Sequence, residues 1–225
     1  MQAVSLRARS LSTSLFLKTL LALSGAGWFF FLINHLYSNL HMFLGRDSFN
    51  AYYDALKESP AMLWGIRGVL IAGIVVHVGT SIVITRRSLE SRPQRYHVKK
   101  DVVTSYAART MRWTGPLVGL YLVYHILHLT VGAAMPAGLA HDPHDYYGNV
   151  VRSFQVPWVA AFYVIANGAL TVHLAHGASS LFQTLGLVDP QVDKTRNVVA
   201  IALAVLVCAG FASMPIAVWA GVLVP

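Results

Sequence analysis

The sequence is poor in charge and almost free of cysteine. Only 12% of its 225 residues are Asp, Glu, Lys or Arg, whereas a soluble domain carries about a quarter. This scarcity, together with a positive mean hydropathy of +0.55, excludes an ordinary soluble domain. The single cysteine, Cys208, excludes an internal disulfide and a metal or iron–sulfur site built on several thiolates. A flavin-binding motif is also absent.

Long apolar runs take the place of the missing charge. Five stretches contain no Asp, Glu, Lys or Arg: residues 19–45, 68–85, 113–140, 153–188 and 197–225. A helix needs roughly 20 apolar residues to cross the hydrocarbon core of a membrane, and the runs lack the strict alternation of barrel strands. We therefore predict an all-α membrane protein, one domain over residues 1–225, with five transmembrane helices near residues 19–45, 64–86, 112–136, 155–187 and 197–223.

The basic residues predict how the chain crosses the membrane. Thirteen of the 17 Lys and Arg precede the first helix or lie in the loops between helices two and three and between helices four and five. Because positive loops mark the cytoplasmic side, the N-terminus is predicted to be cytoplasmic. The net charge of +8 therefore reflects topology and does not indicate nucleic-acid binding. The basic loop 86–112 is too short for a catalytic domain but suits contact with lipid head groups or an acidic partner.

Histidines stand inside the predicted helices. His41 lies near the outer end of the first helix. Each of the first four helices carries at least one histidine deeper in the membrane, and these six are His35, His77, His125, His128, His173 and His176. Ionisable residues within a membrane are rare and usually functional. Imidazole is a good neutral ligand for haem iron, and facing helices of a bundle hold cofactors in their core. Four ligands on four helices predict a bundle with two bis-histidine haems.

The depth of two of these histidines places them in the outer half of the membrane. His35 lies 17 residues beyond Lys18, and His125 lies 13 residues beyond Arg112. At 1.5 Å per helical residue, these separations are roughly 25 and 20 Å from the cytoplasmic edge. His35 and His125 are therefore predicted to pair around an outer haem.

Two other histidines lie in the inner half. His77 is nine residues before Arg86, roughly 13 Å from the same edge. His173 is 15 residues before Val188, in a run whose last residues are expected to lie outside the hydrocarbon core. His77 and His173 are therefore predicted to pair around an inner haem.

Two helices offer a second candidate ligand. His128 follows His125 by three residues, and His176 follows His173 by three. Residues three apart share a helix face, so periodicity leaves each choice open. The residue that does not bind iron could orient its neighbour or approach a haem propionate or a quinone.

Four segments carry a resemblance to a known family. They are NHLYSNLHMFLG (residues 34–45), the His77 position ahead of Thr-Arg-Arg at 85–87, TGPLVGLYLVYH (114–125) and HLAHGASSLFQTLGL (173–187). Over about residues 20–187, the chain resembles the diheme cytochrome b membrane-anchor subunit of succinate dehydrogenase and fumarate reductase complexes. In that family, five helices hold two b haems through one histidine on each of the first four, which here match His35, His77, His125 and His173.

The resemblance implies a role within a larger enzyme. The chain would anchor a flavoprotein subunit and an iron–sulfur subunit on the cytoplasmic side of a prokaryotic cytoplasmic membrane. It would pass electrons between the iron–sulfur clusters and a quinone, with menaquinone as a common partner, while the complex oxidises succinate or reduces fumarate. It would supply no catalytic residue of its own, and a higher oligomer of the complex is possible.

The chain departs from one branch of that family, and other functions stay open. That branch has a glutamate two residues before the fourth ligand, where this chain has Thr171. Asp54 and Glu58 are the candidate acidic residues for an outer quinone site. One alternative is a diheme cytochrome b of another respiratory dehydrogenase, although the FQTLGL ending of the fourth helix argues against it. The other is a histidine-containing transporter without haem, for which acidic partners or broken helices within the membrane would be expected.

Overall fold

The computed structural model describes residues 13–91, 106–186 and 193–225. Within those ranges the regular structure is helical throughout, and five helices are long and apolar enough to cross a membrane, which confirms the predicted fold class. The long helices are α2 (Ser14–Leu40), α4 (Pro60–Glu90), α5 (Tyr106–His125), α7 (Pro157–Thr184) and α8 (Asp193–Trp219). A 3-10 turn, η1 (His41–Leu44), continues α2, and a π-helical turn, η2 (Ile126–Val131), continues α5.

The first two long helices extend beyond their charge-free runs. Helix α2 starts five residues before the expected position, because the hydroxyl of Thr13 caps it by accepting a hydrogen bond from the Phe16 N–H at 3.2 Å. Lys18 lies inside this helix. Helix α4 starts at Pro60, which suits a first helical position, and continues to Glu90. Long charged side chains near the ends of a span can reach the membrane interface, so charge does not mark where such a helix stops.

The third span ends earlier than expected. The sequence predicts a helix to residue 136, but the helical turns end at Val131, and Gly132 follows with a left-handed φ of 79°. A Cβ atom at Gly132 would lie 2.5 Å from the Cβ of His141, so the chain reverses tightly there. The fourth and fifth long helices also end within the predicted ranges, at Thr184 and Trp219.

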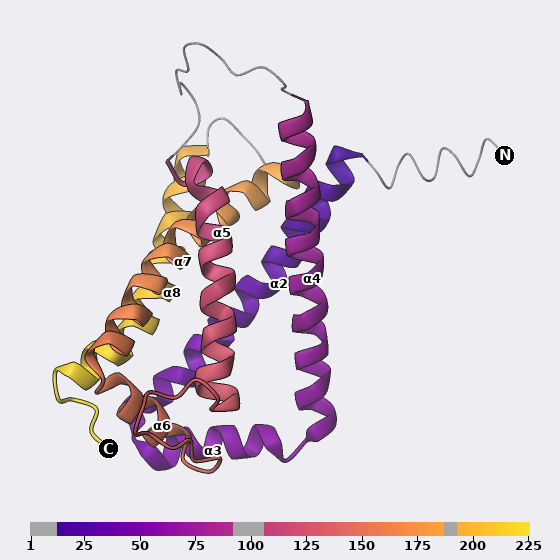
Figure 1. Cartoon of the computed structure of the whole chain (residues 1–225). Helices are drawn as coiled ribbons and strands as arrows, with labels where there is room; N and C mark the ends of the chain where they lie inside the picture. Colours follow the sequence, from indigo (N-terminus) through magenta and orange to yellow (C-terminus); the bar gives the residue numbers. More distant parts are fainter. Residues whose placement is uncertain (1–12, 92–105, 187–192) are drawn as a thin grey trace.

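The long helices differ in how they pack (Figure 1). Helix α2 crosses the bundle diagonally and contacts α4, α7 and α8. Helix α4 packs chiefly on α2, whereas α5 packs chiefly on α7, which α8 covers along its length. As a result, α4 and α5 are each held mainly by one neighbour within this chain.

Two short helices close one end of the bundle (Figure 1). They are α3 (Arg46–Lys57) and α6 (Tyr146–Phe154), which pack on each other. We call η1, α3, the loop 132–145 and α6 the cap. The opposite end, here the basic end, carries the start of α2, the end of α4, the start of α5, the end of α7 and the start of α8. Much of the basic charge predicted to face the cytoplasm falls in segments 1–12 and 92–105, which lie outside the described residues.

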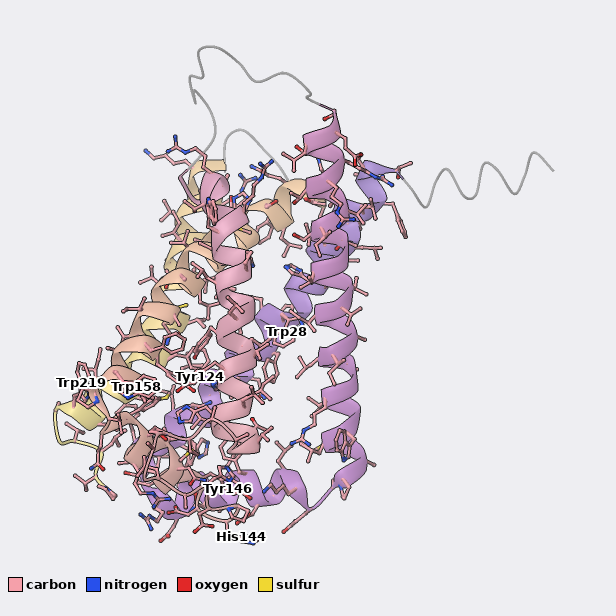
Figure 2. The ribbon with its side chains drawn as sticks, in the orientation of Figure 1. Trp28, Tyr124, His144, Tyr146, Trp158 and Trp219 are labelled. Carbon is pink, nitrogen blue, oxygen red and sulfur yellow. The ribbon has the colours of Figure 1, made fainter. Side chains whose placement is uncertain are left out.

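The buried apolar core lies toward the cap. Phe49 of α3 is 2% exposed, and it belongs to a cluster with residues of α2, α6, α7 and α8, among them Leu36, Val151, Phe154, Tyr163 and Met214. By contrast, the long helices retain exposed apolar faces, with Val69 at 73% and Leu120 at 70% exposure. Trp158 and Trp219 are both exposed near the cap end (Figure 2), where amphipathic rings suit a membrane interface.

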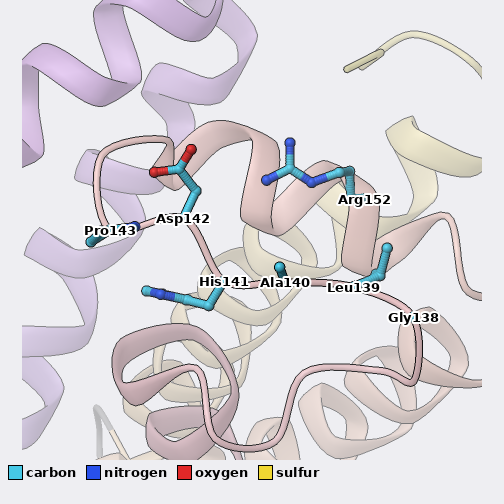
Figure 3. Close-up of a pocket in the computed structure, with 7 residues that line it drawn as sticks. All are labelled: Gly138, Leu139, Ala140, His141, Asp142, Pro143 and Arg152. Carbon is cyan, nitrogen blue, oxygen red and sulfur yellow. The ribbon is translucent and has the colours of Figure 1, made fainter.

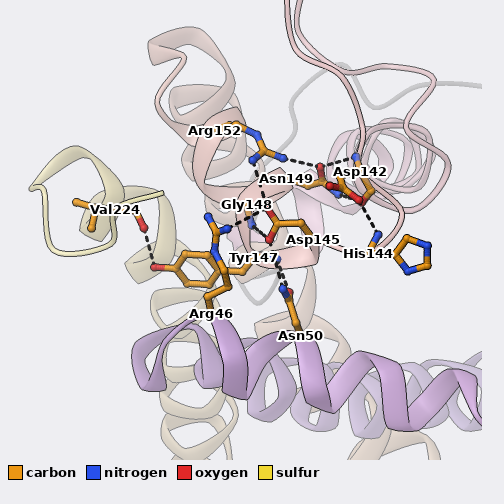
Figure 4. Close-up of polar contacts among 10 residues, drawn as sticks. All are labelled: Arg46, Asn50, Asp142, His144, Asp145, Tyr147, Gly148, Asn149, Arg152 and Val224. Atoms are coloured by element: carbon orange, nitrogen blue, oxygen red, sulfur yellow. Dashed lines mark hydrogen bonds and ion pairs between the residues drawn. The ribbon is translucent and has the colours of Figure 1, made fainter.

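Asp145 joins the two helices of the cap (Figure 4). Its Oδ1 atom accepts hydrogen bonds from the Gly148 N–H at 2.9 Å and from Asn50 Nδ2 at 3.3 Å. Its Oδ2 atom lies 3.2 Å from Arg152 Nη1 and 3.6 Å from Arg46 Nη1. Burial by itself raises the pKa of Asp145, but the hydrogen bonds from Gly148 and Asn50 and the charges of Arg46 and Arg152 hold that pKa below its usual value of 3.8.

Removing this carboxylate is expected to destabilise the cap in a pH-dependent way. Asp145→Ala should lower the free energy of unfolding by about 1–3 kcal/mol at neutral pH, the cost of losing a part-buried charged acceptor. Because the pKa of Asp145 is lower in the folded protein, its contribution is complete above 3.8 and is lost as the pH falls through the folded value. Thermal unfolding of the detergent-solubilised protein at neutral and acidic pH measures this. The exposed Asp47 on the same helix as Asn50 provides the control, Asp47→Ala. A pH-independent loss would contradict the prediction.

Candidate functional site

His35 and His125 are neighbours near the cap end of the bundle. Their ring centroids lie 5.9 Å apart, with the ring planes at 79°. Phe31 stacks on His35 at 5.4 Å, and Phe211 of α8 lies 5.6 Å from it. Tyr121 lies 5.8 Å from His125. An imidazole from α2 thus meets one from α5 inside an aromatic shell, and we call the two residues the cap pair.

His77 and His173 form a second pair nearer the basic end. Their ring centroids lie 6.3 Å apart, with the planes at 64°. Ser24 Oγ lies 3.3 Å from His77 Nδ1 and donates its own hydrogen to the Leu20 carbonyl at 2.7 Å. The Ser24 oxygen therefore acts as acceptor for an Nδ1–H of His77, which leaves the lone pair of that ring on Nε2. The Nδ1 atom of His173 is buried and has no hydrogen-bond partner among the residues that the structure describes.

Two glycines lie close to the rings of the second pair, which we call the basic-end pair. A Cβ atom on Gly25 of α2 would lie 3.1 Å from Cε1 of His77, which is tighter than ordinary contact. A Cβ atom on Gly115 of α5 would lie 3.8 Å from Cε1 of His173. The glycine on α2 therefore lets its helix backbone approach a ring that a larger residue would displace.

The histidine pairs join helices that are not close packing partners. The cap pair links α2 to α5, although α5 packs chiefly on α7. The basic-end pair links α4 to α7, although α4 packs chiefly on α2. All four residues are half-buried. Opposed imidazoles between separated helices would suit two ligand pairs for haem iron. The unpartnered ring nitrogen and the neighbouring glycines belong to the basic-end pair.

His128 lies one turn from the cap pair, in a different environment. It has no exposed surface, and both of its ring nitrogens are engaged. Nδ1 lies 2.9 Å from the hydroxyl of Tyr163, and Nε2 lies 3.0 Å from Oγ of Ser153. An imidazole with both nitrogens in hydrogen bonds has no lone pair left for iron, so the geometry favours His125 over His128 as ligand.

His176 lies one turn from His173 on α7. It is half-buried, and within the described ranges no hydrogen bond or ring contact joins it to another side chain. His173, in contrast, faces His77. The ring pairing therefore favours His173 over His176.

The candidate quinone residues lie in or next to the cap, and within the described residues neither forms a hydrogen bond with a paired histidine. Asp54 Oδ1 accepts a hydrogen bond from the Tyr146 hydroxyl at 3.1 Å and so ties α3 to α6. Glu58 is exposed at the C-cap of α3. The observed role of Asp54 is thus structural, and quinone binding by either residue stays a prediction.

An open pocket of about 480 Å³ lies on the cap (Figure 3). It is lined by the loop 138–143 and by Arg152, with His141 and Asp142 among its polar groups. None of the four paired histidines lines it, so it belongs to the surface of the cap and not to the ligand sets.

Comparison with known proteins identifies a family. Residues 84–211 match the profile of a family described as "Succinate dehydrogenase/Fumarate reductase transmembrane subunit". The matched segment covers more than half of the chain and includes His125 and His173, whereas His35 and His77 precede it. No curated protein matches the chain. No solved structure matches it either.

Proposed function

The chain belongs to the succinate dehydrogenase/fumarate reductase transmembrane subunit family, and on this premise we propose that it is the electron-transfer anchor of such a complex. As a member of the family it is a multi-pass membrane subunit with five apolar helices. The proposal adds that it holds two b haems and conducts electrons between an iron–sulfur subunit and a quinone. The reaction of the whole complex is succinate oxidation or fumarate reduction.

The observation that carries this proposal is the pairing of four histidines from four helices. His35 and His125 would hold one haem, and His77 and His173 the other. When bound, haem supplies an iron that accepts and returns single electrons. The protein's own part is to bind the iron through neutral imidazoles, to exclude water with aromatic rings such as Phe31 and Phe211, and to orient the rings through their second nitrogens.

The two ends of the bundle suit different partners. We place the iron–sulfur and flavoprotein subunits at the basic end, on the cytoplasmic side of a prokaryotic membrane, because positive loops face the cytoplasm. We place the quinone, with menaquinone as the first candidate, near the cap pair. Asp54 and Glu58 are the acidic residues in or next to the cap that we assign to this site. Higher oligomers of the complex are compatible with the exposed apolar faces of the long helices.

A visible spectrum of the purified complex tests the proposal directly. We expect a dithionite-minus-oxidised difference spectrum of b type, with a haem-to-chain ratio of about two for two bis-histidine sites. Iron–sulfur and flavoprotein subunits should copurify with a tagged form of this chain. A complex without haem would contradict electron transfer through this chain and favour a transporter. Two haems with a different dehydrogenase attached would favour the other diheme cytochrome class.

A further inference from the structure

A line of buried polar groups runs from the cap pair toward α6. The Tyr163 hydroxyl lies 3.4 Å from Nδ1 of His125 and 2.9 Å from Nδ1 of His128. Nε2 of His128 lies 3.0 Å from Oγ of Ser153, which in turn lies 3.9 Å from Sδ of Met135. Tyr163, His128 and Ser153 are at most 4% exposed. Polar groups this deeply buried are costly unless they are satisfied by one another.

The chemistry of the last group determines which group donates and which accepts in every hydrogen bond of the line. The thioether of Met135 can only accept, so the Ser153 hydroxyl donates to it. The Ser153 oxygen then accepts from Nε2–H of His128, because serine has no second hydrogen to donate. A neutral His128 with its hydrogen on Nε2 accepts at Nδ1, and the donor is the Tyr163 hydroxyl. The Tyr163 oxygen is left as the acceptor for Nδ1–H of His125.

These hydrogen-bond directions leave His125 in the tautomer that can bind iron. With its hydrogen on Nδ1, the ring keeps the Nε2 lone pair, which is the pair that a metal ligand must offer. We propose that Tyr163, backed by His128 and Ser153, is a positioning residue that fixes the tautomer of His125 and increases its electron donation to the haem iron. The inference rests on the proposed function, since it assigns a role within the predicted outer haem site.

The two haem sites would then differ in how their ligands are supported. On the basic-end pair, Ser24 accepts from His77, and Nδ1 of His173 has no partner among the described residues. On the cap pair, His125 donates into a line of four further side chains, which ends at Met135. An acceptor on the second nitrogen makes an imidazole a more basic ligand. A more basic ligand stabilises ferric iron, so loss of the Tyr163 hydroxyl should favour the reduced state of the outer haem alone.

A redox titration of the purified complex tests this role without relying on turnover. The outer haem is identified as the one that His125→Ala removes. In Tyr163→Phe, the reduced-to-oxidised ratio of this haem should rise by about three- to tenfold at a fixed solution potential. A tenfold rise corresponds to about 59 mV for a one-electron couple. The other haem should titrate as in the unmodified complex. The electron paramagnetic resonance signal of the ferric outer haem should change as well, because it reports the ligand field.

Tyr124→Phe is a closely matched control. Its ring lies 5.2 Å from His128, and its buried hydroxyl has no hydrogen-bond partner in the described part of the chain. This variant removes the same atom from the same neighbourhood and should leave both haem potentials unchanged. Identical titrations of Tyr163→Phe and Tyr124→Phe would overturn the inference.

A second variant keeps the inference testable if Tyr163→Phe does not assemble. Ser153→Ala leaves Tyr163 in place but removes the acceptor of Nε2–H of His128. A smaller shift of the outer haem in the same direction would support the polarised line, and the absence of a shift would overturn it. Absence of haem from the unmodified complex is a separate result, which would overturn the proposed function itself.

Discussion

Alanine in place of His77 or His173 is expected to remove one of two b haems, and alanine in place of His35 or His125 is expected to remove the other. Each change deletes one imidazole of a facing pair, and a single remaining imidazole in an apolar site binds iron weakly. The dithionite-minus-oxidised absorbance per chain should fall to about half in each single variant, because each site contributes one haem.

Double variants identify which histidines share a haem. His77→Ala combined with His173→Ala should lose no more haem than either change alone, whereas His77→Ala combined with His125→Ala should lose both haems. His176→Ala is the control, since His176 lies one turn from His173 without a ring partner in the described structure. It should retain both haems. Loss of both haems on changing His77 alone, or retention of both, would contradict the paired scheme.

Valine in place of Gly25 is expected to eliminate the inner haem without touching a ligand. The Cβ atom alone would lie 3.1 Å from Cε1 of His77, and the two methyl groups of valine add further bulk. The ring is also tied to Ser24, so it cannot move away without losing that hydrogen bond. We expect Gly25→Val to lose most of the haem that His77→Ala loses, as measured by the same difference spectrum.

Gly27 provides a close control on the same helix. A Cβ atom there would meet nothing within 4 Å, and the position is exposed. Gly27→Val introduces the same β-branched residue, with a similar intrinsic effect on the helix, so it should keep both haems. Equal haem loss in the two variants would show that helix disruption, and not the contact with His77, is responsible.

The sequence is sufficient to predict the long helices and the histidine pairs as neighbours. Charge-free runs of span length specify membrane helices because the bilayer excludes charge. The constant helical rise then converts position along the chain into depth, which predicts His35 beside His125 and His77 beside His173. The rings lie beside each other in both pairs. Whether these pairs hold iron remains a prediction.

The sequence cannot decide between His125 and His128. Three-residue spacing places both on one helix face, and the deciding partner is Ser153 on α6. That short helix, with its N-cap at Asp145, begins in a segment between two predicted spans, where no helix is expected. The role of Tyr163 also cannot be predicted from the sequence, because a tyrosine in an apolar run usually indicates packing. The partners of its hydroxyl, His128 and His125, lie 35 and 38 residues away in the sequence. Nothing in the sequence around Tyr163 indicates that they are its neighbours.

The uneven packing of the long helices has a consequence for how the subunit is made. The cap end has a buried core of its own, whereas α4 and α5 are each held mainly by one neighbour, and both histidine pairs lie across helices that pack little on each other. A ligand that binds only the folded arrangement stabilises it in proportion to the logarithm of its free concentration. If the pairs hold haem as we propose, the newly inserted chain would depend on haem supply for its lifetime in the membrane. When haem is scarce, quality-control proteases would remove the subunit, so that the abundance of the complex follows the cofactor.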